Sequence, residues 1–445
     1  MWSSRGRSRD RSARSTAPPT AASRTSPTST SSGTATRSGA EGGLPRPRGS
    51  LVSGDAPRGS GAPATRTARE RGRPGRSTMK GLMMNRPLKI ADILDYAAEV
   101  HPEGEIVSVR TEGDVHRQTY PETRARVARL AHGLRALGVQ TGDRIATLAW
   151  NGHRHFELYY GVSGIGAVCH TINPRLSAEQ MAYIVAHAGD TMLFTDLTFV
   201  PLLEKLAPML PEGLRYVVMT DRAHMPETSL DALCYEEILE GQPEDIDWPD
   251  LPEDAAAGLC YTSGTTGHPK GALYTHRSTV LHAMMIAISL PAALQAGNRI
   301  LPVVPLFHVN AWGLPYAAPL TGASLVMPGP KLDGASLYEL MEREHVFSAW
   351  GVPTVWLGLL NEIRERGRKP GAFRDVVVGG SAAPTSMIAA FEEMGVNVCH
   401  AWGMTEMSPV GTQGNLPPSM DDWPLADRVA KKSMQGRRVF GVDLK

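Results

Sequence analysis

From Leu88 onward, the hydrophobic positions of the chain follow two alternating patterns. One has helical spacing: Ile90, Ile93, Leu94 and Ala97 fall on a single stripe, which predicts an amphipathic helix. The other is a short apolar run beside turn residues, which predicts a buried strand. Helices are predicted at 90–100, 119–137, 155–166, 177 onward, 278–290, 337–344, 355–366 and 385–394. Strands are predicted at 144–149, 167–172, 192–195, 216–220, 257–262, 299–304, 324–327, 346–350, 376–378 and 397–401.

Strands that alternate with helices indicate an α/β fold with layered, largely parallel sheets. The chain of 445 residues has room for two or three ordinary domains or for one large, multi-lobed domain. Residues 416–432 are polar and contain Pro, so we expect a loop there. Residues 438–445 have the pattern of a strand, and the chain stops inside it.

Residues 1–78 differ in amino-acid composition from the rest of the chain, with fifteen Arg, no Lys and four acidic residues. Their net charge of +11 leaves −10 for the remainder, which is that of an ordinary soluble body. The segment has almost no large aliphatic residues, so we expect it to be disordered. An organelle transit peptide, a nucleic-acid-binding tail and sequence upstream of a mis-assigned start all remain open, and we favour the last. Met79, Met83 or Met84 would then open the protein.

Composition limits the compartment and excludes some classes of site. The four cysteines are scattered without metal-ligand spacing, which predicts free thiols in a reducing compartment, the cytoplasm. No run of about 18 apolar residues predicts a membrane span. We expect His153 and His155 on a helix surface, and His101 and His116 in loops. No Gly-x-Ser-x-Gly elbow suggests a serine hydrolase.

A loop rich in glycine and hydroxyl groups follows the predicted strand 257–262. Its sequence is Thr262-Ser263-Gly264-Thr265-Thr266-Gly267-His268-Pro269-Lys270. Glycines let backbone N–H groups approach a polyanion, hydroxyls donate hydrogen bonds, and a lysine supplies positive charge to phosphate oxygens. The spacing is not that of a Walker A loop, because Lys270 precedes Gly271 rather than Ser or Thr.

The string from Thr262 to Gly271, with Tyr274-Thr-His276 after it, resembles the signature of the adenylate-forming superfamily. The resemblance covers the chain from about Leu88 to its end, and its texture is most similar to bacterial medium-chain fatty-acid CoA ligases. It implies that residues 88–445 form the large, multi-lobed N-terminal AMP-binding domain of that α/β fold. The small C-terminal domain would be absent.

Three further motifs carry the resemblance. In Pro305-Leu-Phe-His-Val-Asn-Ala-Trp312 it implies that His308 lies beside the reacting carboxylate. In 378–384 it implies that Gly380, Ser381 and Ala382 lie along the adenine. In His400-Ala-Trp-Gly-Met-Thr-Glu406 it implies that Trp402 stacks near the adenine, Thr405 binds the α-phosphate and Glu406 holds Mg²⁺, a cation that prefers carboxylate and phosphate oxygens. Trp402 stands where the family more often has Tyr.

The resemblance implies an enzyme that converts a carboxylate, ATP and CoA into an acyl-CoA thioester through an acyl-adenylate. Apolar stretches at 302–328 and 351–356 fit an aliphatic acid, and methylthio-propionate is an alternative. The implied partners are small molecules, with no nucleic acid and no membrane span, and a homodimer is left open. Because the family has further residues beyond a position equivalent to Lys445, we expect impaired adenylation. A non-catalytic nucleotide-binding fragment or pseudo-enzyme, and a peptide-synthetase module, are the rival interpretations.

Overall fold

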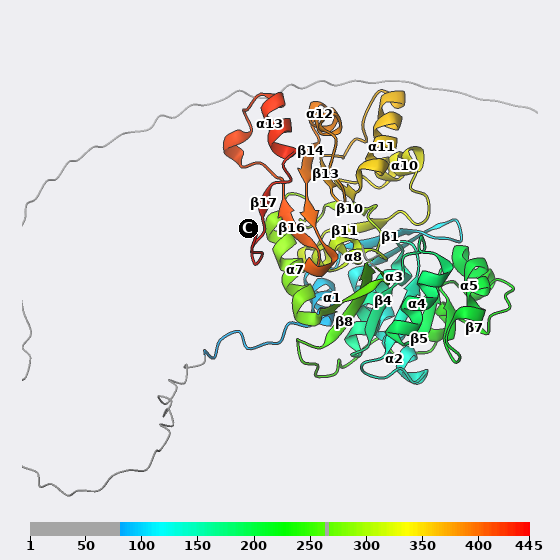
Figure 1. Ribbon diagram of the computed structural model, residues 1–445. Coiled ribbons are helices and arrows are strands. Elements are labelled where there is room, and N and C mark those ends of the chain that lie inside the picture. The colour runs from blue at the N-terminus through cyan, green and yellow to red at the C-terminus, as the bar shows by residue number, and fades with distance from the viewer. Residues whose placement is uncertain (1–80, 263–266) are drawn as a thin grey trace, which may run out of the picture. The chain divides into compact units, whose positions relative to one another are not determined.

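The structure is a computed structural model, and it describes residues 81–262 and 267–445. The segment 1–78, expected to be disordered, lies outside the described residues. Residues 81–445 form one compact unit built around two seven-stranded sheets and one small sheet (Figure 1). None of the described helices is both long enough and apolar enough to cross a bilayer.

The first sheet has the order β14-β13-β12-β10-β11-β1-β2, and all its neighbours are parallel except β1 and β2. Its strands are β14 (Asn397–His400), β13 (Asp375–Val378), β12 (Ser348–Gly351), β10 (Arg299–Pro302), β11 (Ser324–Met327), β1 (Glu105–Val109) and β2 (Val115–Thr119). Because β11 and β12 flank β10 on opposite sides, the carboxyl ends of β10 and β12 form a topological switch point, where α/β folds bind ligands.

The second sheet repeats this plan in the order β7-β6-β5-β3-β4-β8-β9, with only β8 and β9 antiparallel. Its strands are β7 (Ala232–Cys234), β6 (Arg215–Val218), β5 (Asp190–Thr195), β3 (Arg144–Leu148), β4 (Val168–Thr171), β8 (Ala256–Thr262) and β9 (Lys270–Thr275). The small antiparallel sheet contains β15 (Trp402–Gly403), β16 (Val410–Gln413) and β17 (Arg437–Arg438). The α/β layering with largely parallel sheets is therefore confirmed.

Helices fill three layers around the sheets, giving an αβαβα stack. Between the sheets lie α1 (Ile90–Val100), α2 (Tyr120–Ala136), α3 (His153–Gly164), α7 (His276–Ser289) and α9 (Leu314–Thr321), whose buried residues share one core with both sheets. The outer face of the first sheet carries α10 (Gly334–Arg343), α11 (Pro353–Arg366) and α12 (Thr385–Glu393). The outer face of the second carries α4 (Ala178–Ala188) and α5 (Val200–Leu206). Shorter elements are α6 (Tyr235–Leu239), α8 (Val309–Trp312) and α13 (Leu425–Lys432), with 3₁₀ turns at Leu197–Phe199, Ala207–Met209, Arg222–His224, Thr405–Met407 and Pro418–Met420.

Local sequence signals explain where several helices begin. Thr119 and Ser177 each accept a hydrogen bond from the backbone N–H three residues later, and the side chains of Glu122 and Gln180 bond back to the caps. Each capping box satisfies two N–H groups that a helix would otherwise leave unpaired. The predicted starts of α2 and α4 follow from these caps.

Four sequence expectations are wrong. Residues 425–432, expected as loop, form α13, and only Arg437–Arg438 of the C-terminal stretch pair as a strand. His116, expected in a loop, lies on β2. His153 and His155, expected on a helix surface, are buried, because every residue of α3 lies between the two sheets.

Buried polar groups on α3 have partners that make this burial tolerable. The imidazole Nε2 of His155 lies 2.9 Å from Thr147 Oγ1, and the His153 ring stacks on His116 with ring centroids 4.0 Å apart. Burial lowers the pKa of His155 to about 4, so this side chain is neutral inside the fold.

Candidate active site

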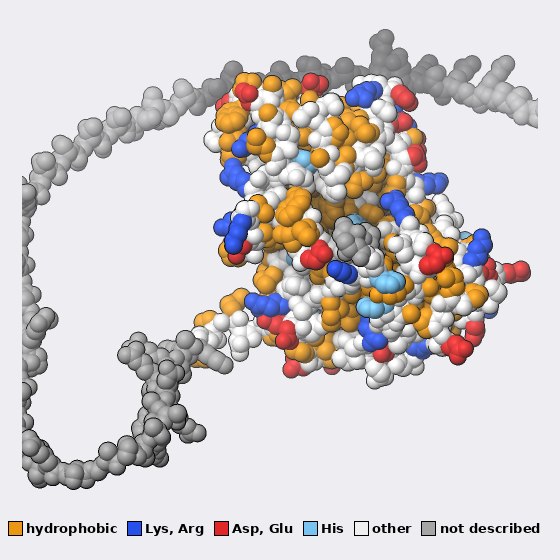
Figure 2. Space-filling view, in the orientation of Figure 1, with side chains coloured by type: hydrophobic (Ala, Val, Ile, Leu, Met, Phe, Trp, Pro, Cys, Tyr) orange, Lys and Arg blue, Asp and Glu red, His pale blue; other side chains and the backbone are white. Residues whose placement is uncertain are grey.

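A cleft opens where the loops after β10, β13 and β14 meet at the carboxyl end of the first sheet. Its volume is about 170 Å³. The residues that line it are His308, Val309, Trp312, Gly379, Gly380, Ala401, Trp402, Gly403, Met404, Thr405, Pro409 and Val410. Figure 2 shows one face of the 81–445 unit, with hydrophobic side chains spread across it among charged and polar ones. The parallel strands thus bring three motifs that are distant in sequence to one wall.

The floor of the cleft needs glycine. A Cβ added to Gly379 would lie 3.0 Å from the indole of Trp312, closer than ordinary van der Waals contact. Gly380 has a φ of 78°, which L side chains rarely adopt. Ser381 and Ala382 follow directly and are exposed, but they are not among the lining residues.

Trp402 and Thr405 both line the cleft. Trp402 is half-buried, and its indole covers Gly411, where an added Cβ would lie 2.7 Å from the ring. Glu406 comes next in the chain and is exposed to solvent. One segment therefore presents an aromatic face, a hydroxyl and a carboxylate in sequence.

Two side chains to which the sequence assigned no role hold this segment in place. The Tyr274 hydroxyl donates to the carbonyl oxygen of Thr405 at 2.6 Å, across 131 residues of sequence. The backbone N–H of Val410 donates to His282 Nε2 at 3.2 Å. Burial lowers the pKa of His282 to about 3, so the ring is neutral and Nε2 can accept. Tyr274 belongs to the quoted motif, but only the fold reveals its partner.

The glycine-rich loop joins β8 to β9 as a hairpin. Thr262 and Lys270 are paired across the two strands, and the side chain of Lys270 is exposed. Ser263, Gly264, Thr265 and Thr266 lie outside the described residues. Gly267 is exposed and has a φ of 149°. Thr262, Gly267 and Lys270 do not line the cleft, but Tyr274 connects their hairpin to it, since it lies four residues after Lys270.

His308 stands at the mouth of the cleft, just before a turn of unusual backbone. Val309, Asn310, Ala311 and Trp312 all have φ between 46° and 56°, so α8 is a left-handed turn built without glycine. This conformation costs roughly 1–2 kcal/mol per residue, and surrounding contacts must offset it.

Contacts from the core hold the turn. Asn310 Oδ1 accepts from the Tyr159 hydroxyl at 3.2 Å, and the same hydroxyl donates to Leu306 O at 2.6 Å. Desolvation, reinforced by the charge of Arg175, lowers the pKa of His308 below its ordinary value. A neutral imidazole therefore faces the cleft near neutral pH.

The protein side chains near the cleft could hold Mg²⁺ only together with phosphate oxygens of a substrate. Within residues 81–262 and 267–445, no three His, Cys, Asp or Glu side chains cluster as a metal site would. Glu406 offers one exposed carboxylate beside the cleft. Mg²⁺ is commonly held by one or two carboxylates together with substrate phosphates, so Glu406 suits that arrangement.

Comparison with known proteins agrees with the fold. A family model described as AMP-binding enzyme matches residues 94–445. The chain is 47% identical over 369 residues to a medium-chain-fatty-acid–CoA ligase of Ectopseudomonas oleovorans, covering 82% of this chain and 68% of that protein. It is also 47% identical over 370 residues, with the same coverage, to a 3-methylmercaptopropionyl-CoA ligase of Ruegeria lacuscaerulensis. A long-chain-fatty-acid-CoA ligase structure from Archaeoglobus fulgidus has a TM-score of 0.68 at 21% identity, covering 80% of this chain and 69% of that one.

Proposed function

The chain belongs to the AMP-binding enzyme family, and from this premise we propose that it is an ATP-dependent acyl-CoA synthetase that activates a fatty acid. The observation that carries the proposal is the cleft, where the loops bearing Gly380, Trp402, Thr405 and His308 converge. A site for both nucleotide and acid needs an aromatic or flat face, anion donors and an apolar side, and this combination occurs there.

We assign the nucleotide to the wall made by the loops after β13 and β14. Gly380, Ser381 and Ala382 would lie along the adenine, and Trp402 would offer a stacking face. The absence of side chains at Gly379 and Gly380 supports this, because a flat ring could approach the backbone closely.

The phosphates are assigned to the glycine-rich hairpin and to the Thr405–Glu406 segment. Thr262, Ser263, Gly264, Thr265, Thr266 and Gly267 would supply N–H and hydroxyl donors, and Lys270 would supply charge. Thr405 would donate to the α-phosphate, while Glu406 would hold Mg²⁺, which supplies charge neutralisation when bound. The hydrogen bond from Tyr274 to Thr405 O supports this grouping, since it couples both segments.

The reaction follows from this arrangement. A carboxylate oxygen attacks the α-phosphorus of ATP, and pyrophosphate leaves with the bonding electrons. The CoA thiol then loses its proton and attacks the acyl carbonyl, and AMP leaves. The chain's residues mainly position anions and offset their charge, because neither step needs a covalent nucleophile from the protein. His308 would lie next to the carboxylate of the fatty acid. Because its imidazole is neutral, it would not form an ion pair that holds the carboxylate back from attacking ATP.

Two classes of acid deserve direct comparison. Medium-chain fatty acids and 3-methylmercaptopropionate are the acids named for the two relatives, which match this chain equally well. Trp312 and Val309 give the cleft an apolar side that suits either.

Location and assembly are proposals as well. All four cysteines are buried free thiols, which supports a reducing compartment, the cytoplasm. The partners would be the small-molecule substrates, and light scattering would test whether two copies associate.

Pyrophosphate exchange tests the function. Labelled pyrophosphate should enter ATP in the presence of Mg²⁺ and a preferred acid, with butyrate, octanoate, palmitate and 3-methylmercaptopropionate compared. Glu406→Gln should lose most of this exchange and should raise the Mg²⁺ requirement. A folded chain that binds ATP but exchanges with no acid would instead be a non-catalytic nucleotide-binding protein.

A further inference from the structure

Asn151 makes three side-chain hydrogen bonds to one distant stretch of backbone. It follows β3 in the second sheet, and the residue is 4% exposed. Its Nδ2 donates to Pro302 O at 2.6 Å and to Val304 O at 2.9 Å, while its Oδ1 accepts from Leu306 N at 2.7 Å. One amide therefore uses both donor hydrogens and its oxygen on three backbone groups, one at the end of β10 and two in the loop that follows.

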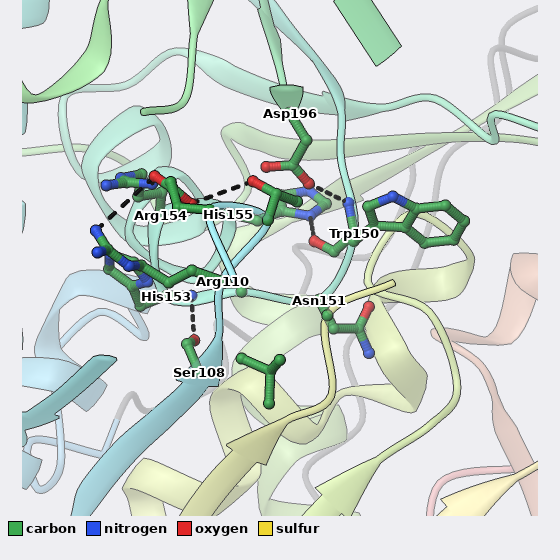
Figure 3. A pocket seen from close by; sticks show the side chains of 13 residues that line it. Ser108, Arg110, Trp150, Asn151, His153, Arg154, His155 and Asp196 are labelled. Carbon is green, nitrogen blue, oxygen red and sulfur yellow. Dashed lines mark hydrogen bonds and ion pairs between the residues drawn. The ribbon is translucent and has the colours of Figure 1, made fainter. Parts of the chain in front are cut away.

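The backbone that carries Asn151 is itself fixed on both sides. Trp150 N donates to Asp196 Oδ2 at 2.7 Å, and Trp150 O lies 3.0 Å from His155 Nδ1. Gly329 N donates to Asn151 O at 3.2 Å. Figure 3 shows Asp196 and His155 converging on Trp150, with the Asn151 amide on the side away from Asp196. The adjoining cavity has a volume of only about 20 Å³, so little space is left for Asn151 to move.

The loop that Asn151 holds ends at the mouth of the cleft. Residues 302–306 lead to His308 and then into the left-handed turn at α8. On the same side, Tyr159 of α3 bonds to Leu306 O. In the second sheet β5 and β4 flank β3 on opposite sides, so the carboxyl end of β3 lies at a switch point as well. Asn151, which follows β3, therefore holds the loop at the switch point of the first sheet.

We propose that Asn151 is a positioning residue that sets the place of His308 and Trp312 at the acid side of the cleft. This rests on the proposed function in assigning that side to the acid. Asn151 lies behind the loop and lines a different cavity from His308. Its effect should therefore fall on the acid and not on the nucleotide, which is assigned to the loops after β13 and β14.

Asn298 provides a matched control. Its Nδ2 also donates to two backbone carbonyls, Ala292 O at 2.8 Å and Ala293 O at 3.2 Å, in a loop that does not line the cleft. Asn151→Asp and Asn298→Asp each replace an amide donor by a carboxylate oxygen facing those carbonyls. Asn151→Ala serves as a second variant if Asn151→Asp does not fold.

Hydrogen exchange tests the positioning without any assay of function. Leu306 N–H loses its buried acceptor in Asn151→Ala, so exchange in the peptide covering 303–312 should speed up by about tenfold or more, while Asn298→Asp leaves this peptide unchanged. Exchange at the wild-type rate in a folded Asn151 variant overturns the inference, whether or not the enzyme is active.

Kinetics test the consequence. In pyrophosphate exchange, Asn151→Asp should lower kcat/KM for octanoate by about 10-fold to 100-fold, while KM for ATP changes by less than about twofold. Asn298→Asp should leave both values near wild type. If Asn151→Asp changed the kinetic constants for octanoate and for ATP by the same factor, Asn151 would have only a general structural role, and the proposal would be overturned. If wild type exchanges with no acid, the proposed function fails, and calorimetric binding of octanoate to wild type and Asn151→Asp decides this point instead.

Discussion

At the scale of single residues, the cleft depends on side chains that would not contact a ligand themselves. Tyr274 and His282 hold the two ends of the segment from Thr405 to Val410, one through a carbonyl and the other through an N–H. Preorganised donors are effective only when their supports are rigid. Changing these supports should therefore alter activity more than it alters stability.

Tyr274→Phe removes the hydroxyl that fixes Thr405 O and leaves the ring in place. We expect about tenfold lower kcat/KM for ATP in pyrophosphate exchange, because Thr405 and Glu406 lose their anchor. The free energy of unfolding should fall by only about 1 kcal/mol. Tyr120→Phe is the control, since the buried Tyr120 hydroxyl donates to Ala323 O outside the cleft. A similar loss of activity in both variants would contradict the assignment to Tyr274.

His282 should make the fold sensitive to acid. Its pKa is about 3 in the folded chain against an ordinary value of 6.5. Below about pH 6.5 the unfolded chain binds the extra proton and the folded chain does not, so stability falls as pH falls toward 3. Between about pH 7.5 and pH 5, this residue alone should cost about 2 kcal/mol.

Urea unfolding at those two pH values measures the effect. His282→Gln keeps an oxygen that can accept from Val410 N, and its loss of stability on acidification should be smaller than that of wild type by about 2 kcal/mol. Equal losses in both proteins would show that His282 does not titrate as its burial requires.

At the scale of elements, hydrophobic periodicity predicted most of what lies in the core. The spacing in residues 90–100 gave α1 to the residue, because one face of this helix is apolar and buried. Periodicity failed at α13, where one of the two buried residues is Lys432. Val429 and Leu425 pack against the outer core of the first sheet, but the buried ion pair of Lys432 with Glu392 is a contact that a hydrophobic pattern cannot predict.

The residues of the candidate site also fall into two groups, those that local sequence motifs predicted and those that only the fold reveals. Local motifs marked His308, Trp402 and Thr405, which line the cleft. Asn151 and His282 act on backbone groups more than 100 residues away, so only the tertiary fold brings them to the site. Neither has a flanking pattern that distinguishes it from an ordinary polar residue.

Lys432 should be essential for docking α13. Its ammonium donates to Glu392 and, at 2.7 Å, to Asn397 Oδ1. Lys432→Met removes the close cation from Glu392, which keeps the backbone N–H of Val398 at 2.9 Å and a longer contact to Arg428 at 3.6 Å. We expect a loss of about 3 kcal/mol in unfolding free energy. The exposed neighbour gives the control: Lys431→Met should cost less than about 0.5 kcal/mol. Equal melting temperatures for the two variants would show that the buried pair does not dock the helix.

At the scale of the whole 81–445 unit, the two large sheets share their central helical layer. The core cluster that contains Ile145 of the second sheet also contains Ile300 and Leu325 of the first. Polar contacts add to this continuity, among them the bond from Tyr160 to Pro315 O at 2.7 Å. If one sheet unfolded, the apolar residues on the inner face of the other would be exposed to water. The two sheets should therefore unfold together.

Hydrogen exchange at rising urea concentrations tests this cooperativity. The most protected amides of β3 and β4 should approach the same unfolding free energy, with the same urea dependence, as those of β10 and β13. Helices on the outer faces, such as α5 and α11, pack against only one sheet and can open at lower free energy. Two separate limiting free energies for the two sheets would mean that each folds by itself, and the loop held by Asn151 would then be a contact between independent halves. A single limit would show that the two sheets unfold as one cooperative unit, so the loop held by Asn151 would lie within one continuous core.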